Sequence, residues 1–301
     1  MAHSKSSKTY KGGIMASNTT LILKGLSHLR YKKLNRELIG FVREADLDPI
    51  SLEDVRLYAS ATNDDPSRYS EESLIPPLFV SRLIHPFLID TILDPRLEMN
   101  ILKMVHGELE IKWIAPVFVK DRLRLRMEIK EIIDTKAGEL LKISFIILKD
   151  NSEVAEAIAG LLIRSPQERE KGKSGGEEKR EVILKKSIQT EGDQALRYAE
   201  ASLDNNLIHT SNLFAKISGL KRTILHGVCG FAITCNELIK EFCNNDSARI
   251  VSMKGRFAHP IYPGDTLTLV CYRSESEKEV EFELVNKYGK KNIRFGRFEF
   301  R

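Results

Sequence analysis

The sequence is poor in the features that mark membrane proteins, disulfide-linked proteins and zinc proteins. Its longest apolar run, residues 227–234, is less than half of the roughly 20 residues needed to span a bilayer. Only four cysteines occur among 301 residues, and none forms a C-x-x-C pair. We therefore expect no membrane span and no structural zinc site, and we interpret the cysteines as buried thiols in a reducing compartment.

A strong excess of one charge is also missing. The chain has 47 Lys and Arg against 42 Asp and Glu, a formal net charge of +5, and the two signs are interleaved. A nucleic-acid-binding protein usually carries a clustered basic stripe, so we expect no nucleic-acid partner. With 42% hydrophobic and 30% charged residues, the composition predicts a globular chain with a sizeable core.

Acidic residues are absent from the first 36 positions. We interpret residues 1–37 as a flexible basic segment. Transit peptides are also acid-poor, but they are rich in Arg, whereas this stretch uses Lys more often. The chain ends in Phe300-Arg301, without a peroxisomal tripeptide. We therefore expect a cytoplasmic protein, with organelle targeting by residues 1–37 as the alternative.

An internal repeat is the most informative pattern. Tyr-Ala-x-Ala-x-x-Asp begins at Tyr58 and again at Tyr198, an offset of 198 − 58 = 140 residues. Pro-x-x-x-x-Asp-x-Leu begins at Pro116 and again at Pro260, an offset of 260 − 116 = 144 residues. Two matches in the same order at nearly the same offset indicate a tandem fold.

A charged stretch without large apolar residues separates the two copies. It covers residues 165–181 and contains Gly and Ser, so we expect a solvated linker. The repeats on either side are residues 38–164 and 182–301. In the second repeat, apolar residues recur at nearly helical spacing over residues 224–242, which predicts a largely buried helix.

Each repeat also has four runs with strand-like alternation. They cover residues 100–114, 122–133, 139–149 and 153–163, and then 249–257, 266–273, 279–286 and 292–300. A buried helix followed by four antiparallel strands predicts an α+β fold in which a sheet wraps around a helix. Two copies would form one continuous, curved double sheet with two central helices.

Groups suited to acid–base chemistry gather in the second repeat. Asp204 and His209 are five residues apart on a predicted loop, with Asn206 between them. A carboxylate and an imidazole on one short loop can both reach a single water and move its protons, and the ordinary pKa of histidine suits this role. The alternative is that the loop is a turn or helix cap and that His209 is a partly buried spacer.

A candidate anion site follows at the start of the buried helix, at His226 and Gly227. Backbone N–H groups at a helix N-terminus favour an anion, and glycine lets a ligand approach the backbone. A developing enolate oxygen would be stabilised there. The alternative is a simple helix-entry turn.

These residues resemble the hydratase 2 motif of the MaoC-like hydratases and dehydratases. The pattern Tyr-x-x-x-Ser-x-Asp-x-Asn-x-Ile-His runs over residues 198–209, a small residue follows at Ala215, and Leu-His-Gly opens the buried helix at 225–227. The strand entry Pro-Gly-Asp-Thr-Leu at 263–267 is also typical of the family. The resemblance covers residues 38–301.

The resemblance implies a double hotdog fold, in which two tandem repeats form a pseudo-dimer. It also implies reversible hydration of trans-2-enoyl thioesters to (R)-3-hydroxyacyl thioesters in fatty-acid metabolism. Asp204 and His209 would be the acid–base pair, Gly227 would polarise the thioester carbonyl, and Asn206 and His226 would bind substrate or hold the loop. No metal or redox cofactor would be needed, and coenzyme A or acyl carrier protein would enter as part of the substrate.

Two positions depart from the family pattern: Leu203 and Leu207 stand where it has Gly and Pro. Both changes affect loop shape rather than a proton-bearing atom. A hotdog acyl-CoA thioesterase and a non-catalytic acyl-thioester-binding protein therefore stay open as alternative functions. For the assembly, we expect a monomer that is itself a pseudo-dimer, or a homodimer.

The first repeat lacks the acid–base pair. Counting from Tyr58, Asp64 keeps the position of the carboxylate, but Pro66 and Tyr69 stand where the second repeat has Asn and His. This asymmetry is hard to explain if the pair is merely structural. We expect Asp64 to be a turn residue, and the resemblance implies that the first repeat makes room for the acyl chain.

Other candidates are interpreted structurally. His106-Gly107-Glu108 is expected in the first strand after the helix, and Trp113 in the core or in the wall of an acyl pocket. The pairs Lys221-Arg222 and Lys290-Lys291 are expected on the solvated surface, with contact to coenzyme A phosphates as the alternative.

Overall fold

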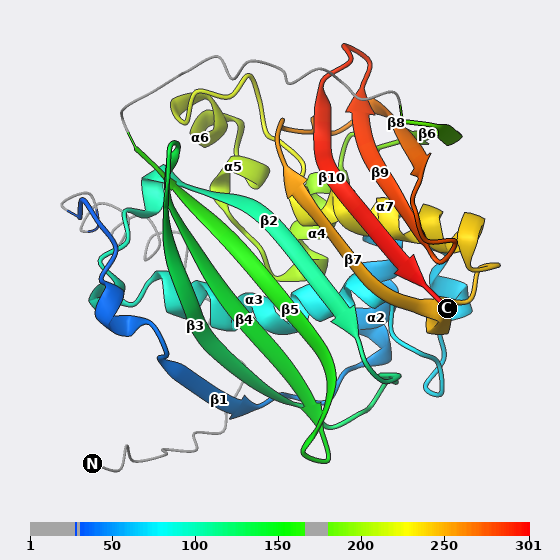
Figure 1. The fold of residues 1–301 in the computed structure, drawn as a ribbon, viewed down its shortest axis with the longest axis horizontal. Helices are drawn as coiled ribbons and strands as arrows, with labels where there is room; N and C mark the ends of the chain where they lie inside the picture. Colours follow the sequence, from blue (N-terminus) through cyan, green and yellow to red (C-terminus); the bar gives the residue numbers. More distant parts are fainter. Residues whose placement is uncertain (1–27, 29–30, 166–179) are drawn as a thin grey trace.

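The described strands form one ten-stranded antiparallel sheet in the computed structural model (Figure 1). The structure describes residues 28, 31–165 and 180–301. The predicted flexible segment 1–37 and linker 165–181 therefore lie largely outside the described residues. Within the described part of the chain, no helix combines the length and the apolar character needed to cross a membrane.

The strands follow the order β1-β3-β4-β5-β2-β7-β10-β9-β8-β6, so each repeat supplies five neighbouring strands. Their bounds are β1 Val42–Asp46, β2 Met104–Trp113, β3 Arg124–Thr135, β4 Gly138–Lys149, β5 Ser152–Arg164, β6 Val182–Gln189, β7 Ile250–Phe257, β8 Thr266–Arg273, β9 Glu279–Asn286 and β10 Lys291–Phe300. The halves join where β2 pairs with β7, with Glu108 opposite Arg256 and Lys112 opposite Ser252. This continuous double sheet is the one that the sequence predicted.

The helices lie on one face of the sheet (Figure 1). They are α2 Leu52–Ala61, α3 Val80–Ile92, α4 Gln194–Ser202, α5 Leu207–Thr210, α6 Asn212–Ile217 and α7 Gly227–Phe242. The predicted buried helix over 224–242 is α7, and it starts at Gly227 because His226 is its N-cap. The central helices α3 and α7 are equivalent elements of the two repeats.

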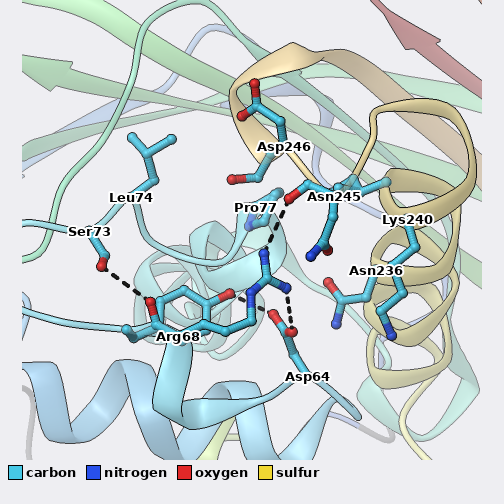
Figure 2. Close-up of a pocket in the computed structure, with 12 residues that line it drawn as sticks. Asp64, Arg68, Ser73, Leu74, Pro77, Asn236, Lys240, Asn245 and Asp246 are labelled. Atoms are coloured by element: carbon cyan, nitrogen blue, oxygen red, sulfur yellow. Dashed lines mark hydrogen bonds and ion pairs between the residues drawn. The ribbon is translucent and has the colours of Figure 1, made fainter.

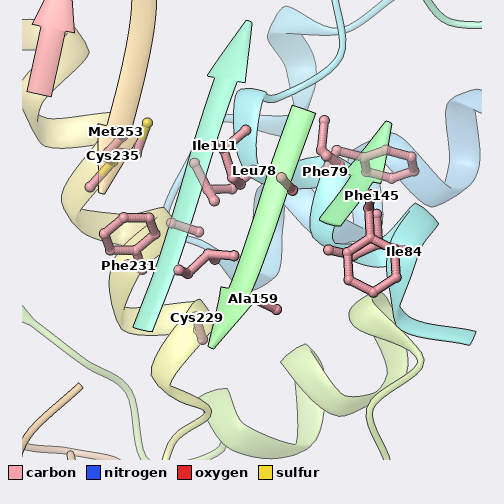
Figure 3. Packing of buried hydrophobic residues seen from close by; sticks show 14 of the residues in the cluster. Leu78, Phe79, Ile84, Ile111, Phe145, Ala159, Cys229, Phe231, Cys235 and Met253 are labelled. Atoms are coloured by element: carbon pink, nitrogen blue, oxygen red, sulfur yellow. The ribbon is translucent and has the colours of Figure 1, made fainter. Parts of the chain in front are cut away.

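Buried apolar side chains fill the space between the central helices and the sheet (Figure 3). Phe231 of α7 and Ile84 of α3 belong to the same core as Ile111 of β2 and Phe145 of β4. The four cysteines are free and buried, as expected from the sequence. One continuous core therefore holds both repeats together.

The repeats meet at their equivalent tyrosines. The hydroxyls of Tyr58 and Tyr198, which are 140 residues apart, lie 3.3 Å from each other, and both side chains are buried. Tyr58 Oη also donates to the Leu78 carbonyl at 2.7 Å. Each repeat therefore combines a central helix with a five-stranded sheet, and the two form the predicted double-hotdog pseudo-dimer.

Candidate active site

The loop after α4 is shaped by one unusual residue and one helix cap. Leu203 ends α4 with a φ of +66°, which turns the chain into the left-handed region. Asn206 then caps α5, because its Oδ1 accepts a hydrogen bond from the Ile208 amide. The main-chain N–H of Asn206 donates to Oδ1 of Asp204 at 3.2 Å. The main-chain N–H of His209 donates to the main-chain carbonyl of Asn206 at 2.9 Å. The two ends of the loop are thereby drawn together.

Asp204, His209 and His226 form one cluster. A carboxylate oxygen of Asp204 and a ring nitrogen of each histidine all lie within 4.8 Å of one another. The two imidazole rings are stacked, with their centroids 3.7 Å apart. Two groups that both hydrogen-bond one water lie roughly 4.5 Å apart, so the cluster has the spacing for a shared water.

Hydrogen bonds to carbonyl oxygens fix the tautomers of both histidines. Nδ1 of His209 lies 2.8 Å from the Ile224 carbonyl and must donate to it, so Nε2 carries a lone pair when the ring is neutral. Nε2 of His226 donates to the Asp204 main-chain carbonyl at 2.8 Å. Nδ1 of His226 is buried and has no partner among the described residues. His226 therefore holds the backbone of the Asp204 loop.

Burial sets the charge state of the cluster. It lowers the pKa of His209, and it lowers the pKa of His226 to about 3. Burial alone would raise the pKa of Asp204. In the acidic range where this carboxyl titrates, attraction to the protonated forms of His85, His226 and His209 outweighs burial and holds the pKa below its usual range. At neutral pH the cluster is an ionised carboxylate beside neutral imidazoles.

Gly227 begins α7 directly after His226. The first amides of a helix have no acceptor within the helix, and the side chain of the N-cap residue, His226, makes no cap hydrogen bond to α7. A Cβ atom at Gly227 would lie 2.9 Å from the ring of Phe257, so only glycine fits here without a shift of the ring. The positive end of the α7 dipole and a glycine amide therefore lie next to the cluster, which suits an anion.

The N-terminal repeat contributes two histidines that sequence reasoning did not assign to the site. Nε2 of His85, on α3, lies 4.0 Å from Oδ1 of Asp204. His106 lies on β2 as predicted, but its ring is 5.0 Å from the Phe257 ring and its buried Nε2 has no partner among the described residues. Burial lowers the pKa of His106 to about 4, and Asp204 acts in the opposite direction. The His-Gly-Glu pattern was the available signal for His106, whereas nothing in the sequence marked His85.

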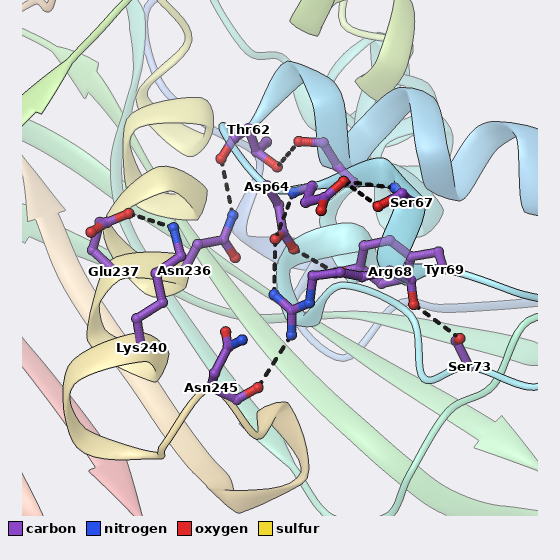
Figure 4. Close-up of polar contacts among 12 residues, drawn as sticks. Thr62, Asp64, Ser67, Arg68, Tyr69, Ser73, Asn236, Glu237, Lys240 and Asn245 are labelled. Carbon is purple, nitrogen blue, oxygen red and sulfur yellow. Dashed lines mark hydrogen bonds and ion pairs between the residues drawn. The ribbon is translucent and has the colours of Figure 1, made fainter.

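In the N-terminal repeat, the positions of Asp204 and His209 are taken by Asp64 and Tyr69, and we call these two hydrogen-bonded residues the closed pair. The hydroxyl of Tyr69 donates to Oδ2 of Asp64 at 2.6 Å, and Arg68 lies 3.1 Å from Oδ1 (Figure 4). Asp64 also accepts from the Asp65 amide, as a turn residue would. Burial and the Asp64 charge raise the pKa of Tyr69 far above its usual value. This phenol therefore stays protonated near neutral pH.

A pocket of about 240 Å³ lies against this closed pair (Figure 2). It is lined by residues of both repeats, including Asp64, Arg68, Asn236 and Lys240. Arg68 also donates to the Asn245 carbonyl at 3.2 Å, so its guanidinium connects the two repeats beside the pocket. The pocket therefore lies beside Asp64 and Tyr69, which are hydrogen-bonded to each other.

The remaining candidates have ordinary surroundings. Trp113 is half-buried, and its Nε1 donates to the Pro77 carbonyl at 3.2 Å. Lys221 and Arg222 are exposed, and Arg222 lies over the Tyr262 ring. Lys291 forms an ion pair with Glu283 at 3.1 Å. The predicted surface position is confirmed for Lys221, Arg222 and Lys290, whereas Lys291 is half-buried. Contact with phosphates stays a prediction.

Asp204, His209 and His226 are also residue types that bind metals, and they lie close enough for one ion. Nδ1 of His209 and Nε2 of His226 are bonded to carbonyls, so Nε2 of His209 and Nδ1 of His226 are the nitrogens left to bind a water or an ion. The absence of a metal requirement stays a prediction.

Comparison with known families agrees with the motif and the fold. Residues 173–293 match the family described as MaoC like domain, and residues 37–157 match the FAS1-like dehydratase domain region. The C-terminal repeat thus matches the MaoC-like domain, and the N-terminal repeat matches the dehydratase region. A solved MaoC-like dehydratase from Phytophthora capsici superposes on this chain with a TM-score of 0.77 at 26% identity, covering 89% of this chain and 98% of the other.

Two curated relatives carry names of activities. The "Probable enoyl-CoA hydratase 2" of Dictyostelium discoideum is 27% identical over 62% of this chain and 70% of its own length. The "3-hydroxyacyl-thioester dehydratase Y" of Mycobacterium tuberculosis is 29% identical over 60% of this chain and 66% of its own length, just under two thirds. The predicted family and double-hotdog fold are therefore confirmed.

Proposed function

We propose that this chain hydrates trans-2-enoyl thioesters reversibly to (R)-3-hydroxyacyl thioesters, and that it acts as a dehydratase in reverse. The observation that carries the proposal is the neutral imidazole of His209, whose Nε2 is free to accept, beside the ionised carboxylate of Asp204 at the spacing that one water bridges. The names of the relatives support the same class of activity.

In the hydration direction, Asp204 and His209 each accept one hydrogen of the bound water. The water oxygen then forms a bond to C3 of the enoyl group while His209 Nε2 takes one proton. The C2–C3 π electrons move onto C2 and the thioester oxygen as an enolate, and the protonated pair returns a proton to C2. The sum is H and OH added across the double bond, with no change in total oxidation state.

The carboxylate of Asp204 makes His209 a better base in this step. A neutral, buried imidazole that accepts a proton becomes a buried cation, which is costly without a nearby anion. Asp204 is already ionised and supplies that anion, so it orients the water and stabilises the imidazolium. Asn206 and His226 hold the loop, Asn206 through the α5 cap and His226 through the Asp204 carbonyl.

The Gly227 amide at the start of α7 polarises the thioester carbonyl and stabilises the enolate oxygen. The thioester itself acidifies C2, so this route uses no metal and no redox cofactor. We propose coenzyme A or acyl carrier protein as the carrier of the acyl group. We further propose a cytoplasmic protein that works as a monomeric pseudo-dimer, with a homodimer as the alternative.

The decisive experiment follows the enoyl-thioester absorbance of crotonyl-CoA and of a longer trans-2-enoyl-CoA. Wild type is expected to remove the band, and Asp204→Asn and His209→Ala are each expected to lower kcat by about 10²-fold or more. Chiral analysis of the product tests the (R) configuration. Thiol release from saturated acyl-CoA would indicate a thioesterase, and acyl-CoA binding without turnover would indicate a binding protein.

A further inference from the structure

Helix α3 of the N-terminal repeat lies against the loop that carries Asp204. Arg82 of α3 donates to the Ala201 carbonyl at 2.6 Å, in the last turn of α4, and also pairs with Asp54 at 2.6 Å. His85 follows Arg82 by three residues and so lies on the same face of α3. Two successive turns of α3 therefore face the end of α4 and the loop that follows it.

The His85 side chain is held close to the Asp204 carboxylate. Its side chain is 14% exposed, and its Nε2 lies 4.0 Å from Oδ1 of Asp204. This distance is longer than a hydrogen bond but within the span of one bridging water. Oδ1 already accepts a hydrogen bond from the Asn206 amide at 3.2 Å.

The two carboxylate oxygens face different partners. Oδ1 faces Asn206 and His85, whereas Oδ2 lies 4.0 Å from Nε2 of His226. The other titratable groups that act on Asp204 are His209, on α5, and His106, on β2. Among these groups, His85 is the one that comes from the central helix of the other repeat.

We propose that His85 is a positioning residue of the active site, which donates from Nε2 through one water to Oδ1 of Asp204 and so fixes the carboxylate in its working orientation. The proposal rests on the proposed hydratase function. In it, the N-terminal repeat lacks an acid–base pair of its own but completes the pair of the C-terminal repeat. His85 transfers no proton to the substrate.

A pair of substitutions separates hydrogen bonding from packing. His85→Leu keeps much of the volume but removes the donor, whereas His85→Gln keeps an N–H donor on a side chain of similar reach. We expect His85→Leu to lower kcat about tenfold with KM changed less than about twofold, which is less than the loss for Asp204 itself. His85→Gln should stay within about threefold of wild type. Full activity of His85→Leu, or equal losses in both variants, would overturn the proposal.

A spectroscopic measurement tests the same contact without turnover. In ¹⁵N–¹H correlation spectra of the imidazoles, Asp204→Asn should shift the His85 Nε2 resonance, while the exposed His259 serves as the internal control. An unchanged His85 resonance would overturn the proposal even if both His85 variants fold poorly. A wild-type protein without hydratase turnover would instead count against the proposed function, and the spectra would still report on His85 and Asp204.

Discussion

Leu203 has a backbone conformation that a leucine rarely adopts. Its φ of +66° lies in the left-handed region, where a residue with a Cβ is disfavoured by about 1 kcal/mol relative to glycine. The family pattern has glycine at this position, whereas this chain adopts the left-handed conformation with a leucine, for which it is less favourable. The departure therefore concerns strain in the loop, where the main-chain N–H of Asn206 still donates a hydrogen bond to Asp204.

This strain can be measured by comparing two truncations of the same side chain. Leu203→Gly and Leu203→Ala both remove the side-chain atoms beyond Cβ, but only glycine, which also lacks Cβ, tolerates a positive φ without strain. We expect the glycine variant to have the higher free energy of unfolding, by about 1 kcal/mol in urea titrations. An alanine variant that equals or exceeds it would contradict the left-handed conformation.

Some residues of the candidate site could be predicted from the sequence, whereas others are identified only by the fold. Asp204, Asn206 and His209 are close in sequence and form a motif, so pattern and resemblance were enough to bring them together. His85 lies in the other repeat, and only the pairing of β2 with β7 and the packing of α3 beside α4 place it at the loop. A contact that depends on assembly of the repeats leaves no local signal in the sequence.

At the scale of elements, the N-terminus of α7 is built around one small residue. A Cβ at Gly227 would lie 2.9 Å from the Phe257 ring, so the ring or the start of the helix would have to shift. We expect Gly227→Ala to lower kcat by about tenfold or more, because the carbonyl of the substrate can no longer reach the amide.

The matched control for this prediction is Gly192→Ala. A Cβ at Gly192 would meet no heavy atom within 4 Å, so activity should be unchanged. Steady-state kinetics with crotonyl-CoA would decide the comparison. Full activity of Gly227→Ala would remove the amide from the proposed mechanism.

The predicted strands agree with the structure because they are long and alternate regularly. The largest offset is at the start of β2, where residues 101–103 form a 3₁₀ turn. Strands β1 and β6 were not predicted. They are the two edges of the sheet, and each buries few side chains, so their sequences carry little alternation. Their pairing depends on neighbours that are distant in sequence.

At the scale of the whole molecule, burying neutral histidines makes stability depend on pH. Burial lowers the pKa of His106 to about 4 and that of His226 to about 3, from 6.5. Between these values and 6.5 the unfolded chain binds more protons, so the free energy of unfolding falls as the pH is lowered through this range. The lowered pKa of Asp204 acts in the same direction, but only below its unfolded value of 3.8.

Urea unfolding between pH 7 and pH 5 measures this effect. Each buried histidine contributes a slope of up to about 1.4 kcal/mol per pH unit. His106→Gln should reduce the slope by one such contribution, whereas the exposed His259→Gln should keep the wild-type slope. Equal stability at pH 7 and pH 5 would show that these imidazoles are not buried in the neutral form.

The two repeats share a scaffold but differ in chemistry. Asp204 faces a neutral imidazole across the span of a water, whereas Asp64 is bonded directly to the Tyr69 hydroxyl and to Arg68. In the proposed mechanism the C-terminal repeat carries the acid–base pair, while the N-terminal repeat contributes half of the continuous sheet and the α3 face that meets the loop. The central claim is that hydration depends on Asp204 and His209 of the C-terminal repeat and not on Asp64 and Tyr69 of the N-terminal repeat.

The most direct test compares Asp204→Asn with the equivalent substitution Asp64→Asn in the hydration of crotonyl-CoA. Each substitution replaces a carboxylate with an amide of the same size at the same position of its repeat. We expect Asp204→Asn to lower kcat by about 10²-fold or more and Asp64→Asn to stay within about threefold of wild type. Equal losses in the two variants, or a larger loss in Asp64→Asn, would contradict a single active site in the C-terminal repeat.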